Sequence, residues 1–309
     1  MRQNGNGGDP PSLPPGGDLR GSRTPQQRGV PRSHFIRVQG VDLHCLEWGT
    51  PTAPPLLLLH GGAAHAHWWD HIAPAFAQDY HVLALDLRGH GDSGWFVPPA
   101  YEVEDYVADV AEVMTALNLV RPVLIGHSLG GFVAMACAIA APQAVRALVV
   151  VDIGTRLGGS RFLRLLRAVP PPVYRDEADL LSRFRLLPVE TSASPALLRE
   201  IARHSVRAQV DGSLRLKCDR ATLTRGPRDL RAQLAQIHCP TLFVRGEKSD
   251  NVSAATLHTL ATCCPRAQGV AIEGAGHHVF LDQPEAFLRA VQTFLGAVLS
   301  QENNERVTE

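Results

Sequence analysis

The pentapeptide Gly126-His127-Ser128-Leu129-Gly130 ends a short apolar run and leads directly into a helical apolar pattern. A serine in a tight turn between a strand and a helix presents its hydroxyl as a nucleophile, and such a turn accepts only small neighbours. The helix that follows directs free N–H groups toward the point where negative charge develops on a substrate oxygen. The motif therefore predicts nucleophilic catalysis by Ser128.

A serine hydroxyl is a weak nucleophile unless a histidine accepts its proton. The chain has 14 histidines, and we take His277 as the candidate base. It ends the run Gly274-Ala275-Gly276-His277, which follows a predicted strand, and small residues there allow an imidazole to approach the serine. The neighbouring His278 is the main alternative.

Acyl transfer also needs two backbone N–H groups that face the developing oxyanion. One is expected from Leu129, directly after the nucleophile. The other is expected from the loop after the strand that ends at His60, where Gly61 and Gly62 let the backbone approach a carbonyl. We therefore predict an oxyanion hole made by Leu129 and Gly62, with Ala63 as the alternative to Gly62.

Short apolar strands that alternate with helices must position these residues. Strands are predicted at 35–38, 43–48, 55–60, 81–86, 122–127, 145–152, 240–246 and 268–273. Helices are predicted at 68–76, 103–119 and 254–263, and an apolar stripe at 287–298 marks a closing helix. This alternation predicts the α/β class, with a mostly parallel, doubly wound sheet covered on both faces.

The alternation stops between residues 155 and 235. Three short amphipathic patterns at 162–166, 180–184 and 197–201 predict an inserted α-helical cap there. The core is accordingly predicted at 33–154 and 236–299. Residues 1–32 are rich in Gly, Pro, Gln and Arg and are predicted to be a disordered tail, and residues 300–309 a flexible C-terminal tail.

Composition restricts the class of protein. The chain has 309 residues, 45% of them hydrophobic, and its formal net charge is zero, so nothing indicates binding to nucleic acid. No apolar stretch is long enough to span a membrane, and no secretory signal is expected. Six cysteines without metal-site spacing predict free thiols and a cytoplasmic protein, with a Cys263–Cys264 disulfide as the less favoured alternative. The oligomeric state stays open.

Together these motifs resemble the α/β-hydrolase fold superfamily. The resemblance rests on His60-Gly61-Gly62, on the segment from Asp86 to Gly91, on the Ser128 pentapeptide, on Asp250 after a strand, and on Gly276-His277. It spans residues 35–299 and implies the chain order serine, acid, histidine. It places the catalytic acid at Asp250. Asp152, at the end of the strand after the Ser128 helix, is used in some relatives, and Asp250 as a mere helix cap near Ser253 is the structural alternative.

Two further features have structural and functional interpretations. The segment His65-Ala66-His67-Trp68-Trp69-Asp70-His71 is one residue too long for a zinc signature, so we expect no metal and no other cofactor.

The cap has fifteen arginines and one lysine against eight acidic residues. This excess is either a solvated face or a rim that attracts an anionic substrate.

We therefore expect a cofactor-free serine hydrolase that cleaves a small-molecule carboxylic ester or lactone through an acyl-enzyme. Carbon–carbon bond hydrolysis and cofactor-free perhydrolysis, as in haloperoxidase-like relatives, use the same residues and stay open. The alternative from another class is a ligand-binding receptor or scaffold of this fold with little turnover. Serine at the position where related epoxide hydrolases and dehalogenases have aspartate argues against both of those activities.

Overall fold

The computed structural model describes residues 29–158 and 169–308. An eight-stranded sheet with the order β1-β2-β4-β3-β5-β6-β12-β13 forms its centre. The strands β1 to β2 and β2 to β4 pair antiparallel, and all the other pairs are parallel. Its strands are β1 (Arg32–Val38), β2 (Val41–Trp48), β3 (Pro55–Leu59), β4 (His81–Leu85), β5 (Val123–His127), β6 (Ala147–Val151), β12 (Thr241–Gly246) and β13 (Ala267–Ile272). The predicted class and the mostly parallel sheet are confirmed.

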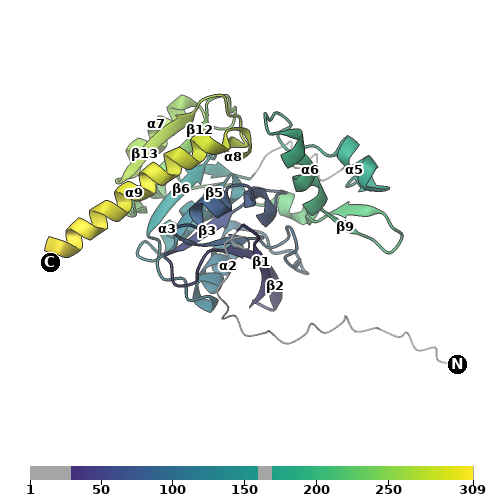
Figure 1. Ribbon diagram of the computed structural model, residues 1–309, viewed down its shortest axis with the longest axis horizontal. Helices are drawn as coiled ribbons and strands as arrows, with labels where there is room; N and C mark the ends of the chain where they lie inside the picture. Colours follow the sequence, from purple (N-terminus) through teal and green to yellow (C-terminus); the bar gives the residue numbers. More distant parts are fainter. Residues whose placement is uncertain (1–28, 159–168, 309) are drawn as a thin grey trace.

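Helices cover both faces of this sheet (Figure 1). One apolar core joins the sheet to α2 (Val103–Ala116), α3 (Leu129–Ala140) and α7 (Ala254–Cys263). The second core joins the opposite face to the 3-10 helix η2 (Ala66–Trp69), α1 (Ala73–Phe76), α8 (Val279–Asp282) and α9 (Pro284–Thr308). Burial of both faces explains why the central strands β3, β4, β5 and β6 are almost wholly apolar.

Two helices differ from the sequence prediction. The helix predicted at 68–76 is divided into η2 and α1, because Pro74 lacks the N–H that a continuous helix would need and instead occupies the first turn of α1. Helix α9 continues through Thr308, into the segment that was predicted to be a flexible tail. The six cysteines are free, so Cys263 and Cys264 form no disulfide.

We call the segment between β6 and β12 the cap. Most of its elements form a lobe beside the sheet (Figure 1), whereas Leu230 and Leu234 pack in the first apolar core. The cap contains α5 (Glu177–Arg183) and α6 (Pro195–His204), which match two of the three predicted amphipathic patterns. The third, at 162–166, lies outside the described residues. The cap also has a three-stranded sheet, β8-β10-β9, which the sequence analysis did not predict.

The smaller elements of the cap complete its description. They are β7 (Arg156–Leu157), β8 (Val173–Tyr174), β9 (Val206–Ala208), β10 (Leu214–Leu216), η3 (Arg220–Thr224), β11 (Arg228–Asp229) and η4 (Arg231–Gln236). Strands of two or three residues are too short to show an alternating apolar pattern, so the sequence does not predict them. Among the described residues, no helix combines the length and the apolar character needed to cross a membrane.

Candidate active site

Ser128 lies in the turn between β5 and α3, with a backbone φ of +49°. Its N–H donates to the carbonyl of Val151 on the neighbouring strand, at 2.9 Å. A Cβ at Gly130 would lie 2.2 Å from the carbonyl oxygen of Leu59, and one at Gly126 would lie 2.3 Å from that of Gly130. The glycines are therefore required by close backbone contacts, which hold Ser128 in a conformation that is costly for a side-chain-bearing residue.

The loop after β3 lies against this turn. A Cβ at Gly61 would be 3.3 Å from the Cβ of Ser128. The N–H of Ala64 donates to the carbonyl of Gly61 at 3.2 Å, so Gly62 and Ala63 are the central residues of a tight turn. That bond uses neither of their N–H groups. The structure thus places Gly61, which precedes the two predicted loop donors, beside Ser128. Leu129 is the first residue of α3, where helical N–H groups have no partner within the helix.

His277 faces the carboxylate of Asp152. Its Nδ1 lies 2.7 Å from Asp152 Oδ2, and both side chains are buried. Asp152 follows β6, whose residue Val151 pairs with His127 of β5. The Ser128 turn and the Asp152 side chain therefore leave the sheet at adjacent strand ends, where ligands of open α/β sheets bind.

Asp152 is held by donors from two directions. Its Oδ1 accepts from the N–H of Gly246 at 3.0 Å, and its Oδ2 accepts from the hydroxyl of Ser249 as well as from His277. The residue is 1% exposed and has a backbone φ of +50°. A buried carboxylate with its oxygens satisfied in this way keeps one orientation, and it fixes the ring of His277 through Nδ1.

Asp250, which the sequence analysis favoured as the acid, does not meet His277. Its side chain is exposed in the loop after β12, and among the described residues it makes no hydrogen bond to that ring. Nor does it cap α7, because Ser253 accepts from the N–H of Thr256. Asp152 meets His277 in place of Asp250 because β6 and β12 are neighbouring strands that end at the same side of the sheet. In the loop after β12, Ser249 turns inward and donates to Asp152.

Three residues that the sequence analysis did not select support His277. The buried ring of His127 donates from Nε2 to the backbone carbonyl of His277 at 2.9 Å. Burial, together with His277 and His278, holds the pKa of His127 well below its usual value, so this ring stays neutral. Ser249 orients Asp152, and the amide nitrogen Nδ2 of Asn251 lies 2.8 Å from His277 Nδ1.

His278, the alternative base, points elsewhere. Its Nε2 donates to the carbonyl of Pro188 in the cap, at 2.9 Å. Burial lowers its pKa, so it acts as a neutral donor. Among the described residues, Ser128 Oγ and His277 form no hydrogen bond, and such bonds often tighten only when substrate is bound. Proton transfer thus requires a closer approach of these two side chains.

The cap is tied to the histidine loop by Asp282. One carboxylate oxygen accepts from the N–H of Gly276 at 2.8 Å, and the other accepts from the hydroxyl of Thr191 and the N–H of Ser192. Asp282 therefore holds the cap residues before α6 next to the loop that contains His277.

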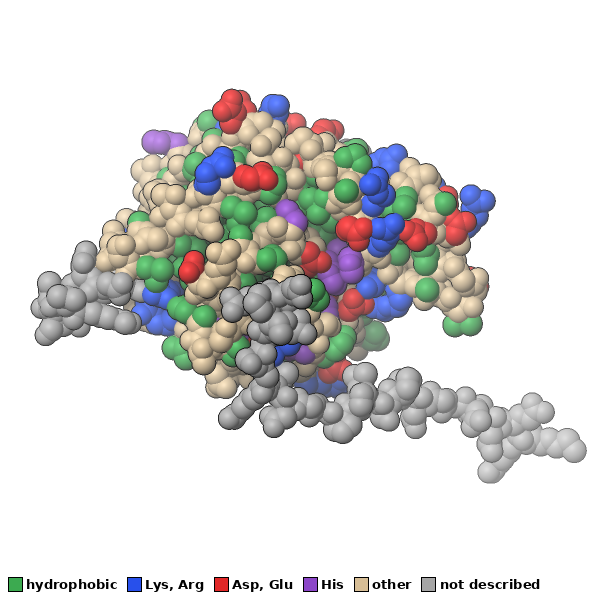
Figure 2. All heavy atoms as spheres, viewed as in Figure 1, with side chains coloured by type: hydrophobic (Ala, Val, Ile, Leu, Met, Phe, Trp, Pro, Cys, Tyr) green, Lys and Arg blue, Asp and Glu red, His purple; other side chains and the backbone are tan. Residues whose placement is uncertain are grey.

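Six of the thirteen basic side chains of the cap that the structure describes form ion pairs with described residues. Arg183 meets Asp179, Arg203 meets Glu177 and Glu200, and other pairs join Arg228 to Glu104 and Lys217 to Asp92. Figure 2 shows blue and red side chains alternating over this lobe. Such exposed pairs neutralise part of the positive charge of the cap.

Arg225 is different, because it lies beside the oxyanion loop. Its Nη2 is 3.8 Å from the position of a Cβ on Gly62, and its Nη1 donates to the hydroxyl of Tyr106 at 3.2 Å. Burial raises the pKa of Tyr106 to about 12, so this hydroxyl stays neutral. The Nε of Arg225 is buried without a hydrogen-bond partner, and no carboxylate among the described residues pairs with the guanidinium. The site thus contains one uncompensated positive charge.

The segment from Asp86 to Gly91 braces the loops around the candidate site. Asp86 accepts from the N–H of Ala66 and from His44, and Arg88 forms a buried ion pair with Asp109. Burial alone would raise the pKa of Asp86, but the hydrogen bond from His44 and the nearby histidines lower it overall. This carboxylate anchors the start of η2 and hence the loop beside Ser128.

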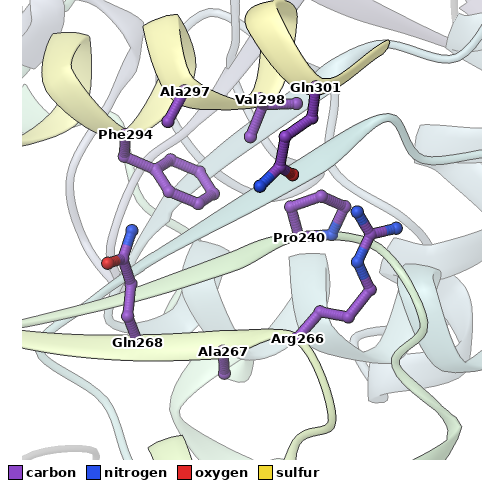
Figure 3. Close-up of a pocket in the computed structure, with 8 residues that line it drawn as sticks. All are labelled: Pro240, Arg266, Ala267, Gln268, Phe294, Ala297, Val298 and Gln301. Carbon is purple, nitrogen blue, oxygen red and sulfur yellow. The ribbon is translucent and has the colours of Figure 1, made fainter. Parts of the chain in front are cut away.

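A cavity of about 750 Å³ lies between α9 and the first residues of β12 and β13 (Figure 3). Its lining includes Pro240, Arg266 and Phe294. Ser128, Asp152 and His277 follow the carboxyl ends of strands, whereas Pro240 and Ala267 mark amino ends. This cavity is therefore separate from the candidate site.

Comparison with known proteins shows the fold family of the chain. A family model described as alpha/beta hydrolase fold matches residues 54–284. The chain is 28% identical over 289 residues to the 2-(acetamidomethylene)succinate hydrolase of Mesorhizobium japonicum, covering 87% of this chain and 98% of that protein. It is 31% identical over 259 residues to the sn-1-specific diacylglycerol lipase ABHD11 of Mus musculus, covering 80% and 82%. The crystal structure of E-2-(acetamidomethylene)succinate hydrolase aligns with a TM-score of 0.76 at 26% identity, covering 86% of this chain and 99% of that one.

Proposed function

Since the chain belongs to the α/β-hydrolase fold family, whose relatives reported above are hydrolases, we propose that it cleaves a carboxylic ester through Ser128, His277 and Asp152. The observation that carries this proposal is the 2.7 Å hydrogen bond between His277 Nδ1 and the buried carboxylate of Asp152, at the sheet edge where the Ser128 turn begins. Nucleophile, orienting acid and base then follow the chain order 128, 152, 277, which this fold uses.

In the proposed reaction, Ser128 Oγ attacks the ester carbonyl while Nε2 of His277 accepts the hydroxyl proton. The carbonyl oxygen becomes an oxyanion, which the N–H of Leu129 and that of Gly62 or Ala63 stabilise by hydrogen bonds. Collapse expels the alcohol, which takes the proton from His277, and leaves an acyl group on Ser128. Water, deprotonated by His277, then releases the acid and restores the serine.

The position of Arg225 favours an ester that bears an anionic group. An uncompensated guanidinium beside Gly62 binds a carboxylate through paired N–H donors, and its buried Nε supplies one of them. One relative is named as a hydrolase of a substituted succinate, which is consistent with this choice. We therefore propose a small ester or lactone with a free carboxylate as the substrate class.

The test is hydrolysis of p-nitrophenyl acetate and of a matched carboxylate-bearing ester by the wild type and by Ser128→Ala. We expect steady turnover by the wild type and a loss of about 10³-fold or more in the variant, because the covalent route is removed. Ser300→Ala, which changes an exposed hydroxyl on α9, is the control and should keep full activity. Absence of turnover in the wild type would favour the receptor interpretation, and a folded Ser128→Ala protein with more than a tenth of the activity would exclude the proposed nucleophile.

A further inference from the structure

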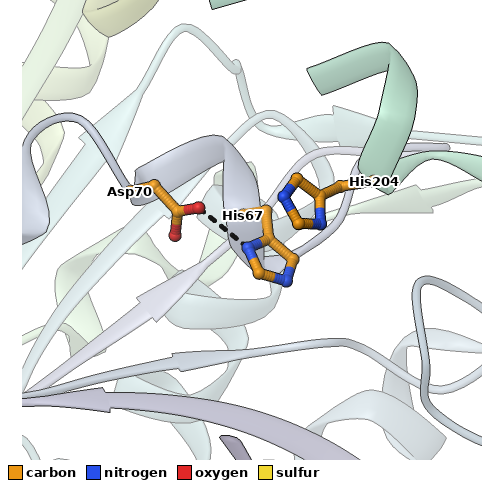
Figure 4. A group of neighbouring side chains, drawn as sticks. All are labelled: His67, Asp70 and His204. Carbon is orange, nitrogen blue, oxygen red and sulfur yellow. Dashed lines mark hydrogen bonds and ion pairs between the residues drawn. The ribbon is translucent and has the colours of Figure 1, made fainter. Parts of the chain in front are cut away.

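His67, Asp70 and His204 gather where the cap meets the core (Figure 4). His67 is in η2 and Asp70 directly follows it, whereas His204 is the last residue of α6 in the cap. Each side chain offers one nitrogen or oxygen ligand atom, and these atoms all lie within 4.8 Å of one another. His67 Nδ1 is 2.8 Å from Asp70 Oδ2.

The three side chains retain free ligand capacity. Asp70 Oδ1 is buried without a hydrogen-bond partner among the described residues. Among the described residues, the ring nitrogens of His204 form no hydrogen bond, so a lone pair is available to a metal ion. A second group, His44, Asp86 and Asp92, lacks this capacity, because Asp86 already accepts from Ala66, Asp92 and His44 and Asp92 pairs with Lys217. Only the first group has vacant acceptor atoms.

We propose that His67, Asp70 and His204 bind one divalent transition-metal ion that links the cap to the core. Two imidazole nitrogens and one carboxylate oxygen are typical ligands of Zn²⁺ and of Co²⁺, Ni²⁺ or Cu²⁺, whereas Mg²⁺ and Ca²⁺ require oxygen ligands. The sequence segment from His65 to His71 lacked a further ligand. The fold supplies one from the cap, His204, which no spacing rule could have found.

Binding requires a local rearrangement. The rings of His67 and His204 are stacked, with centroids 3.6 Å apart and an angle of 16° between their planes. Bonds of about 2.0–2.2 Å to one ion bring ligand atoms to within about 3.5 Å of each other, with each lone pair directed at the metal. The His204 ring must therefore swing out of the stack. Its place at the end of α6 and its partial exposure leave room for that rotation.

The experiment is isothermal titration of the full-length, metal-stripped protein with ZnCl₂, using MgCl₂ as the comparison ion. We expect one Zn²⁺ per chain, no Mg²⁺ binding at this site, and visible absorption bands when Co²⁺ replaces Zn²⁺. His204→Ala removes the cap ligand, and Asp70→Asn keeps the shape of the third ligand while removing its charge. Both variants should weaken Zn²⁺ binding by about 10-fold or more.

The control is His258→Ala, which removes an exposed histidine on α7 and should bind Zn²⁺ like the wild type. Thermal melting supplies a second readout, because an ion that binds only the folded chain raises Tm, and His204→Ala should lose that increase. Equal Zn²⁺ affinity and equal Tm increase in the wild type and in His204→Ala would overturn the proposal, as would the absence of binding in the wild type. The test does not measure the reaction of Ser128, so its outcome is independent of the proposed function.

Discussion

Replacement of Asp152 by Asn tests the acid assignment most directly. The wild-type carboxylate accepts from His277 Nδ1, Ser249 and Gly246. In the variant, the amide oxygen can keep the bond to Gly246, which leaves the NH₂ group facing His277. An NH₂ group donates to Nδ1 and so moves the ring proton to Nε2, where it blocks acceptance of the Ser128 proton.

The wrong tautomer in an otherwise intact site lowers kcat by up to about 10⁴-fold, which corresponds to about 5 kcal/mol of activation free energy. The assay is kcat for a p-nitrophenyl ester, with circular dichroism and thermal melting to verify folding. Asp250→Asn is the matched control, because its side chain is exposed and makes no hydrogen bond to His277 among the described residues. It should stay within about twofold of the wild type. A severe loss in folded Asp250→Asn together with a mild effect of Asp152→Asn would refute the structural assignment.

Three other perturbations have definite expected outcomes. Arg225→Gln should raise KM for a carboxylate-bearing ester by about 10-fold or more, because charged hydrogen bonds contribute about 1.5–3 kcal/mol. The KM for a matched neutral ester should not change, and equal effects on the two esters would argue against carboxylate binding. Burial, with a smaller contribution from His60, lowers the pKa of His90 to about 3, so below pH 6.5 the unfolded chain takes up a proton that the folded chain does not. Between pH 6.5 and 5 this residue should therefore remove about 2 kcal/mol of stability, and urea unfolding of His90→Gln should show a correspondingly flatter pH dependence. Gly130→Ala places a Cβ 2.2 Å from the carbonyl oxygen of Leu59. This contact should lower the free energy of unfolding by about 1–3 kcal/mol in the same urea assay. An unchanged denaturation midpoint would contradict this expectation.

The sequence by itself determined the frame of the molecule. Runs such as Leu56–Leu59 and Val123–Ile125 are apolar on both faces, and only a sheet covered by helices on both sides buries them. The Ser128 pentapeptide identified its own turn, because its glycines are dictated by contacts within a few residues and across adjacent strands. Local periodicity likewise located α5 and α6, since α5 buries Leu180 and α6 buries Ile201 and Ala202 on one side.

Tertiary structure alone decided which carboxylate meets the base. Asp152 and Asp250 both follow parallel strands that end at one sheet edge, and β6 and β12 are direct neighbours, so spacing along the chain cannot separate them. The choice depends on the positive φ of Asp152 and on the inward turn of Ser249, which are properties of packed loops. The meeting of His204 with His67 and the place of Arg225 beside Gly62 are of the same kind. Both contacts join the cap to the core between residues that are far apart in the sequence. The packing of the cap on the core brings these residues together, so no local sequence pattern predicts the contacts.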